Sequence, residues 1–253
     1  MAVEIHERAL VHPQASLGEN VSVGPFSYIG EGVEVGDGSR VLAHATLLGP
    51  TRIGKRATVF PYATLGAPPQ DRSYDSAPTE LFVGDGVTFR EQVTVHRGTE
   101  KGGGLTRIES GCLLMVGVHV AHDCHVERDV VLTNLTLLGG HVRVGARATL
   151  GGQVIVAPFT TLGRLCFVAG GARVETDVPP FSIVQGDRAR VRGLNKVGLA
   201  RAEVSPASQA ALKRAYRKLF CGAQPRALAA AELANDPDPL VAELCRFLLA
   251  HRG

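Results

Sequence analysis

Aliphatic side chains recur at every sixth position along most of the first 174 residues. One unbroken series consists of Ile5, Val11, Leu17, Val23, Ile29, Val35, Val41, Leu47, Ile53, Val59 and Leu65. The series resumes in the same phase at Val83, Phe89 and Val95, and a last one consists of Ile108, Leu114, Val120, Val126, Leu132, Leu138, Val144, Leu150, Val156, Leu162, Val168 and Val174. Since a helix repeats every 3.6 residues, a period of six indicates short strands joined by tight corners instead.

Small or β-branched residues lie two positions before most of these anchors. They are Ala9, Ala15, Val21, Ser27, Ala45, Ala57, Ala63, Cys112, Cys124, Ala148, Cys166 and Ala172. Residues two apart in a strand face the same side, so anchors and small residues together fill one interior. Three hexads make one coil, and stacked coils predict an all-β fold, a left-handed parallel β-helix of hexapeptide repeats.

Two breaks in the period and a change of composition predict the domain organisation. Residues 1–192 form the β-helix domain, with excursions near 66–82 and 97–107, where prolines, charges and glycines replace anchors. Residues 193–253 form a small C-terminal α-helical domain, because Ser205-Pro206 and Asp238-Pro239 are typical helix starts. Loops that interrupt a rigid solenoid are where we expect function.

Composition narrows the class of protein. The formal net charge of +3 is too small to favour nucleic acid, and no basic stretch alternates with aromatic residues. The start of the chain has no secretory pattern and no apolar run reaches about 18 residues, so we expect a cytoplasmic protein without stable membrane insertion. Five cysteines without a CxxC pair predict reduced thiols, three of which fill the interior.

Eight histidines precede the helical region, and none occupies an anchor or the small position before one. We therefore expect none of them in the core. His122 and His141 are nineteen residues apart, one coil plus one residue, so they should meet on one edge of neighbouring coils. His119 is close enough to reach the same groove, and Asp123 could orient an imidazole as a general base. Exposed backbone amides at Gly139 and Gly140 could stabilise an oxyanion.

Four motifs on this repeat resemble one enzyme family. They are "VTVHRGTEKGGGLTRI", "VAHDCHV", "GGHVRVG" and "DVPPFSIVQGD". With the helical tail, they resemble the UDP-N-acetylglucosamine O-acyltransferases that begin lipid A synthesis, over essentially the whole chain. The resemblance implies a homotrimer with active sites between subunits. It also implies transfer of a hydroxyacyl chain from acyl carrier protein to the 3-position of a UDP-sugar, with no cofactor and no metal.

The resemblance also implies roles for individual residues. His122 would be the general base, Asp123 its supporting carboxylate, and the Gly140 amide the oxyanion donor. Substrate-binding positions would be Gln70, Asp71, His119, His141, Gly170, Asn195 and Arg201, with Gly170 lining the acyl groove and Asn195 and Arg201 meeting the nucleotide.

Five positions depart from the pattern of that family. Ser73 replaces a lysine, Ala157 and Pro158 replace a His-Gln pair, Val197 replaces a glutamate, and Ala202 replaces the second of two arginines. In the family these positions bind nucleotide or sugar. The acceptor is therefore less firmly predicted than acyl transfer, and an amine on a different UDP-amino sugar is an alternative acceptor.

Two further readings come from other classes of protein. A trimeric carbonic anhydrase would hold zinc through three histidines, here His119, His122 and His125. A binding protein that has lost its substrate contacts is the other, although His122, Asp123 and Gly140 are all present.

Positive charge gathers where the solenoid meets the helical region. Arg188, Arg190 and Arg192, followed by Lys196 and Arg201, form this cluster, and Arg164 and Arg173 fall on nearby coils. Such a basic rim predicts a docking surface for an acidic acyl carrier protein.

Overall fold

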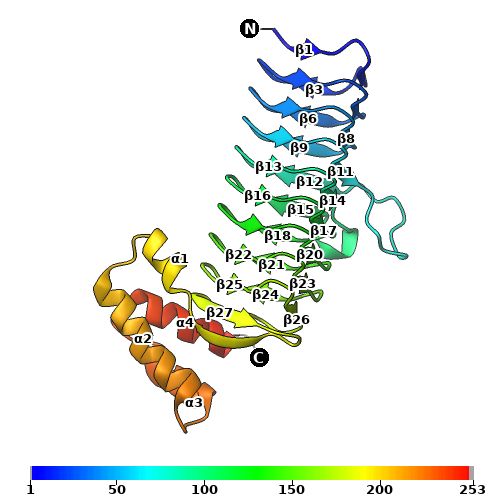
Figure 1. The fold of residues 1–253 in the computed structure, drawn as a ribbon. Helices are drawn as coiled ribbons and strands as arrows, with labels where there is room; N and C mark the ends of the chain where they lie inside the picture. The colour runs from blue at the N-terminus through cyan, green and yellow to red at the C-terminus, as the bar shows by residue number, and fades with distance from the viewer. Residues whose placement is uncertain (1, 251–253) are drawn as a thin grey trace.

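Each hexad forms a short strand and a corner, and the strands stack into a tall three-sided solenoid (Figure 1). This computed structural model describes residues 2–250. Its fold is the left-handed parallel β-helix that the period of six predicts. Successive strands of one sheet are mostly eighteen residues apart, as in the pairing of His119 with Leu137, so one coil is three hexads.

The strands of residues 2–250 form three sheets, one for each side of the prism. The first sheet contains β1 (Glu4–Ile5), β4 (Ser22–Val23), β7 (Arg40–Val41), β10 (Thr58–Val59), β13 (Thr88–Phe89), β16 (Leu113–Leu114), β19 (Val131–Leu132), β22 (Thr149–Leu150), β25 (Phe167–Val168), β27 (Ser182–Gln185) and β28 (Arg190–Leu194). The second contains β2 (Leu10–Val11), β5 (Tyr28–Ile29), β8 (Thr46–Leu47), β11 (Thr64–Ala67), β14 (Thr94–His96), β17 (His119–Val120), β20 (Leu137–Leu138), β23 (Ile155–Val156) and β26 (Arg173–Val174). The third contains β3 (Ser16–Leu17), β6 (Val33–Val35), β9 (Thr51–Ile53), β12 (Glu80–Val83), β15 (Leu105–Ile108), β18 (His125–Val126), β21 (Arg143–Val144) and β24 (Thr161–Leu162). Every pairing of named strands is parallel except that of β27 with β28, which closes the solenoid.

The interior is filled as the sequence predicts. The anchors from Val23 to Val174 are buried, and Cys112, Cys124 and Cys166 lie among them with thiols whose pKa burial raises to about 12. Such thiols stay protonated and act as small apolar side chains. The first anchor is different: Ile5 is 49% exposed because no coil covers the N-terminal end.

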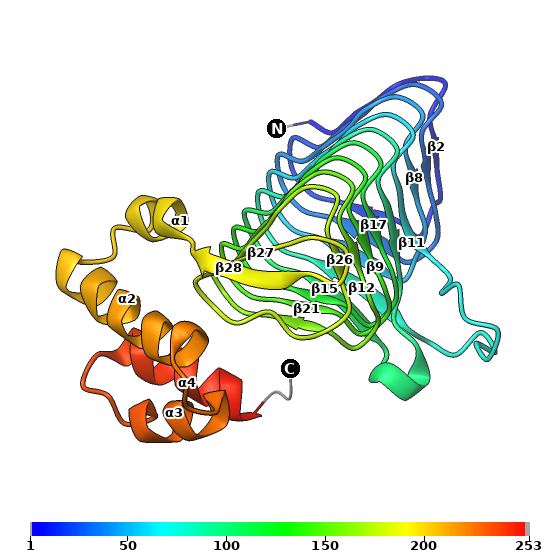
Figure 2. The ribbon, with the colours of Figure 1, turned by 60° about the horizontal axis from the view of Figure 1, so that its bottom comes forward.

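Both excursions leave the solenoid at the edge between the second and third sheets (Figure 2). The first spans residues 68–79 between β11 and β12, and the second spans 97–104 between β14 and β15. The second contains a one-turn 3₁₀ helix, η1 (Glu100–Gly102). Because they belong to successive coils, the two excursions are neighbours in space.

The C-terminal helices pack beside the last coils. They are α1 (Lys196–Arg201), α2 (Pro206–Cys221), α3 (Arg226–Leu233) and α4 (Pro239–Ala250). The two predicted caps are confirmed, since Ser205 Oγ accepts a hydrogen bond from the amide of Ser208, and Asp238 Oδ1 from that of Leu240. Leu165 and Phe181 of the solenoid contribute to the helical core, which fixes the helices to the coils. Among residues 2–250, no helix is both long and apolar enough to cross a membrane. Residues 251–253 of the predicted helical domain, including His251, lie outside the described part.

Candidate active site

The edge between the second and third sheets, called the histidine edge below, carries His122 and His141. His122 follows β17 and His141 follows β20, so they lie at the same corner of neighbouring coils. The two rings meet edge to face, with centroids 5.2 Å apart. The prediction that these two histidines converge is confirmed. Both excursions leave the solenoid at the same edge, in the two coils that precede His122, and can therefore form one side of the site.

Left-handed corner residues form a ladder along this edge. Asp123, His141 and Phe159 are eighteen residues apart, with φ angles of 60°, 63° and 63°. The ring of His141 stacks on that of Phe159, with centroids 4.3 Å apart and planes within 7°. Phe159 lies eighteen residues, or one coil, after His141, so its position at this edge could be predicted from the sequence. Nothing in the hexad pattern marked it as a site residue.

The carboxylate of Asp123 is buried and fully engaged. Its Oδ2 lies 2.7 Å from Nδ1 of His122, accepts a hydrogen bond from Thr99 Oγ1 at 2.6 Å, and lies 3.6 Å from Nε2 of His141. Its Oδ1 accepts from the Thr99 amide at 2.8 Å. A carboxylate acts here as acceptor, so Nδ1 of His122 is the donor to Asp123 and Nε2 is the nitrogen in position to act as a general base.

Two glycines approach this pair so closely that a side chain would not fit. A Cβ on Gly102 would lie 2.0 Å from the Asp123 carboxyl carbon, and one on Gly140 would lie 2.7 Å from His122 Cε1. Within residues 2–250, the amide of Gly140 donates no hydrogen bond. The amide is therefore unengaged beside His122, and its role as an oxyanion donor stays a prediction.

His119 lies one strand position away from the corner and is held by its neighbours. Its Nδ1 lies 2.8 Å from Thr94 Oγ1, and its ring meets the edge of His96 at 5.3 Å. Burial lowers the pKa of His119, and the charges of His96 and His122 lower it further, so this ring is neutral near pH 7.

We expected no histidine in the core, and His96 is nonetheless buried, on the outer side of the solenoid. It is only 8% exposed, and its Nδ1 lies 2.6 Å from the carbonyl oxygen of Pro68. The reason is the path of the first excursion, which covers His96 from outside the solenoid. The position of a residue in its hexad indicates only whether its side chain faces the interior of the solenoid. This contact with a loop outside the solenoid could therefore not be predicted from the hexad pattern.

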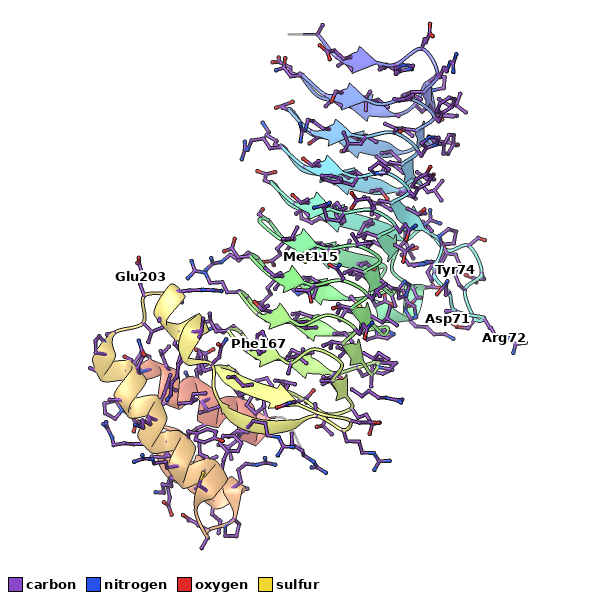
Figure 3. The ribbon with its side chains drawn as sticks, viewed as in Figure 1. Asp71, Arg72, Tyr74, Met115, Phe167 and Glu203 are labelled. Carbon is purple, nitrogen blue, oxygen red and sulfur yellow. The ribbon has the colours of Figure 1, made fainter. Side chains whose placement is uncertain are left out.

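The first excursion carries Gln70 and Asp71, and Figure 3 shows Arg72 at its outer end, farther from the coils than Asp71. Asp71 Oδ1 accepts hydrogen bonds from the amide of Ser73 at 2.8 Å and its hydroxyl at 3.0 Å. These bonds lower the pKa of Asp71, with smaller contributions from the charges of His122 and Lys101. Asp71 is therefore an ionised acceptor near the histidine edge, while Gln70 is exposed.

An apolar groove of about 370 Å³ leads away from His119 over the outer face of the second sheet. Leu137 and Ile155 lie along it and are 40% and 43% exposed. Ala157 and Pro158, which depart from the family pattern, also line it. Aliphatic residues at outward strand positions were the sequence signal for this groove, which suits an alkyl chain.

The remaining predicted positions lie away from His122 within one chain. Asn195 and Arg201 line a cavity of about 520 Å³ between the first sheet and α1. The Asn195 side chain accepts from the amide of Gly198 at 2.9 Å and donates to the carbonyl of Leu165 at 2.8 Å, so it caps α1 and ties it to the solenoid. Gly170 is exposed at the edge between the first and second sheets.

Comparisons with known proteins agree with this geometry. The profile described as "Udp N-acetylglucosamine O-acyltransferase; Domain 2" matches residues 177–253, and the bacterial transferase hexapeptide profile matches residues 14–49. Two proteins named acyl-[acyl-carrier-protein]–UDP-N-acetylglucosamine O-acyltransferase match nearly end to end. The one from Campylobacter concisus is 36% identical over 97% of this chain and 94% of its own length. The one from Sinorhizobium fredii is 39% identical over 98% and 93%.

This chain belongs to the UDP-N-acetylglucosamine O-acyltransferase family. Solved structures agree: LpxA from Acinetobacter baumannii superposes with a TM-score of 0.94 at 30% identity, covering 98% of this chain and 97% of that one. The UDP-N-acetylglucosamine acyltransferase from Campylobacter jejuni gives 0.94 at 32% identity, with the same coverage. The protein is accordingly an acyltransferase.

Membership of the acyltransferase family argues against the hypothesis of a zinc carbonic anhydrase, and the positions of the three histidines argue against it independently. His125 points outward from the third sheet, where its Nε2 lies 2.8 Å from Glu109 Oε1. His119 projects from the second sheet, so the three predicted ligands do not converge. Among residues 2–250, the group whose ligand atoms lie within 4.8 Å of one another is instead His122, Asp123 and His141.

The predicted basic rim for this acyltransferase is smaller than the sequence indicated. Arg164 forms two hydrogen bonds of 2.7 Å with Glu243 of α4, so its charge is neutralised in holding the helical domain. Arg188 lies 3.3 Å from Glu175, whereas Arg190 and Arg192 are exposed on β28.

Proposed function

We propose that this protein transfers a hydroxyacyl chain from acyl carrier protein to the 3-hydroxyl of a UDP-N-acetylglucosamine-type sugar. The reaction would be the first step of lipid A biosynthesis and would take place in the cytoplasm. One observation carries the proposal: a histidine–carboxylate pair lies beside an unengaged backbone amide, and the nearby His119 and Gly139 line a mainly apolar groove.

The proposed reaction begins with proton removal. Nε2 of His122 takes the proton of the sugar hydroxyl as its oxygen attacks the thioester carbonyl carbon. The C–O bond forms, and the carbonyl oxygen becomes an oxyanion that accepts a hydrogen bond from the Gly140 amide. Asp123 stabilises the imidazolium through Nδ1. The C–S bond then breaks, and the carrier thiolate leaves with the proton that His122 took up.

Other residues place the two substrates. The acyl chain would lie in the groove of Leu137 and Ile155, whose apolar surface it would remove from water. Asp71 would accept hydrogen bonds from sugar hydroxyls, and His119 and His141 would hold the acceptor beside the base. Arg201 and Asn195 would face the nucleotide, with Gly170 leaving room for a long acyl chain.

We propose a homotrimer because the histidine edge and the cavity of Arg201 lie on different sides of one chain. Arg147 and Thr149 of that cavity belong to the same coil as His141. Rotation about an axis parallel to the solenoid keeps each coil at its height, so the cavity of one subunit can face the histidine edge of the next. A second wall would also cover the groove.

Incubation with a panel of acyl carrier protein thioesters and UDP-sugars, followed by mass spectrometry, tests the activity. An acylated UDP-N-acetylglucosamine that mild base cleaves is an ester and supports the proposal. A base-resistant amide on an amino sugar would replace the hydroxyl acceptor by an amine, and the absence of any acyl transfer would refute the function.

Mixed assembly tests the shared site. Subunits carrying His122→Ala and subunits carrying Arg201→Glu should each be inactive, and co-refolded mixtures should regain activity. If the mixtures stay as inactive as the separate variants, the two sites do not combine between chains.

A further inference from the structure

The cavity between the first sheet and α1 is lined by both apolar and positively charged side chains. Its apolar lining comes from Leu165, Phe167 and Ile183 of the solenoid and from Val197 of α1. Two charged side chains line it, Arg147 and Arg201, and no carboxylate does so. Such a cavity favours a ligand that joins an anionic group to a less polar, flat part.

Arg147 is only weakly neutralised by its surroundings. Its Nε lies 3.7 Å from Asp129 Oδ2, the same oxygen that accepts a hydrogen bond from Arg128 at 3.1 Å. One carboxylate thus faces two guanidinium groups, so it neutralises the charge of Arg147 only in part. Within residues 2–250, Arg201 forms no ion pair.

The positive charge in this cavity comes from these two arginines, beside the polar side chains of Thr149 and Asn195. Both ends of the Asn195 amide are already hydrogen-bonded within the chain. Val197 and Ala202 offer no side-chain donor. Arginine, with its planar fork of N–H groups, is the side chain best suited to phosphate oxygens.

We infer that Arg147 is a substrate-binding residue that, together with Arg201, holds the diphosphate of the nucleotide sugar. The inference rests on the proposed function and adds a residue to it. The cavity then takes a nucleoside diphosphate, with the phosphates between the two guanidinium groups and the nucleoside against Phe167 and Ile183. The phosphate of a phosphopantetheine arm has the same chemistry, and the experiment separates the two sources.

Three variants of the full-length protein test the assignment. Arg147→Ala removes the cation, Arg147→Lys keeps charge without the fork, and Arg128→Ala removes the neighbour that shares Asp129 but does not line this cavity. Steady-state kinetics would give KM for the UDP-sugar and, separately, for the acylated carrier. Calorimetry would give Kd for UDP without any turnover.

We expect Arg147→Ala to raise KM for the UDP-sugar and Kd for UDP on the order of tenfold, with kcat and KM for the carrier within about twofold. Arg147→Lys should lie between it and the parent, and Arg128→Ala should match the parent. An unchanged Kd for UDP, an effect on the carrier alone, or an equal effect of Arg128→Ala would overturn the assignment while leaving acyl transfer intact. If the parent neither binds UDP nor acylates a UDP-sugar, the proposed function fails with it.

Discussion

Nδ1 of His122 lies 2.7 Å from Oδ2 of Asp123, and the same oxygen accepts a hydrogen bond from the hydroxyl of Thr99 at 2.6 Å. The second excursion therefore reaches back across one coil to fix the carboxylate that orients the base. His122 and Asp123 thus belong to the solenoid, while Thr99 of the second excursion fixes the carboxylate that orients the His122 ring.

The first prediction concerns the base itself. His122→Ala should lower kcat by about 10²–10⁴-fold, because it removes the imidazole that pairs with the buried carboxylate of Asp123 and lies beside the free amide of Gly140. Asp123→Asn should cost less, since the amide still hydrogen-bonds to the ring. Both proteins should keep the circular dichroism spectrum and thermal midpoint of the parent to within a few degrees. Near-normal turnover by His122→Ala would remove this residue from the mechanism.

Gly102 provides a test that leaves every polar group in place. In Gly102→Ala the new methyl would lie 2.0 Å from the Asp123 carboxyl carbon, so the carboxylate or the loop must shift. We expect kcat to fall roughly 10- to 100-fold, since such displacements disturb alignment. Gly193→Ala is the matched control, because a Cβ there has no atom within 4 Å. Equal activity of the two variants would show that the loop does not position Asp123.

Phe159 is 73% exposed and stacks on His141, so it should hold that ring rather than the core. Phe159→Ala should lower kcat/KM about 2- to 12-fold, the range that corresponds to one aromatic pair. Phe159→Tyr should restore the stack and the activity. If the alanine variant instead loses thermal stability while kcat/KM per folded protein stays constant, the ring has a structural role alone.

Regular parts of this molecule could be predicted from sequence, and parts that depend on loop paths could not. The anchors obey one rule because every coil repeats the same side-chain environment, and the same arithmetic placed His122 beside His141. The contact between Thr99 and Asp123 depends on how residues 97–104 fold back, which no period encodes. Similarly, the Arg164–Glu243 pair joins residues 79 apart in different domains, so Arg164 was wrongly assigned to an open basic rim.

His119 makes stability depend on pH. Its pKa is lower in the folded state than the ordinary value of 6.5, chiefly through burial. Below pH 6.5 the unfolded chain binds a proton that folded His119 does not, so acidification through this range favours unfolding. The His119→Asn variant has no imidazole at this position and so cannot take up this proton on unfolding. Its urea midpoint should therefore fall less between about pH 7.5 and about pH 5.5 than that of the parent. Parallel losses in both proteins would contradict the assignment of this shift to His119.

The last prediction concerns docking of the acyl carrier. Arg190 and Arg192 are exposed on β28 and Arg188 is paired only with the exposed Glu175, which leaves a reduced basic rim where the solenoid meets the helices. Reversal of all three to Glu should raise KM for the acylated carrier roughly tenfold at low ionic strength and flatten its salt dependence, because long-range attraction of an acidic protein is lost. Turnover at saturation, and use of a short thioester without the carrier, should change little. The control for net charge is the triple reversal of Arg8, Arg40 and Arg56 to Glu, all exposed on the N-terminal coils, and it should leave KM for the carrier close to that of the parent. A triple variant that keeps the parent's KM would place the carrier elsewhere.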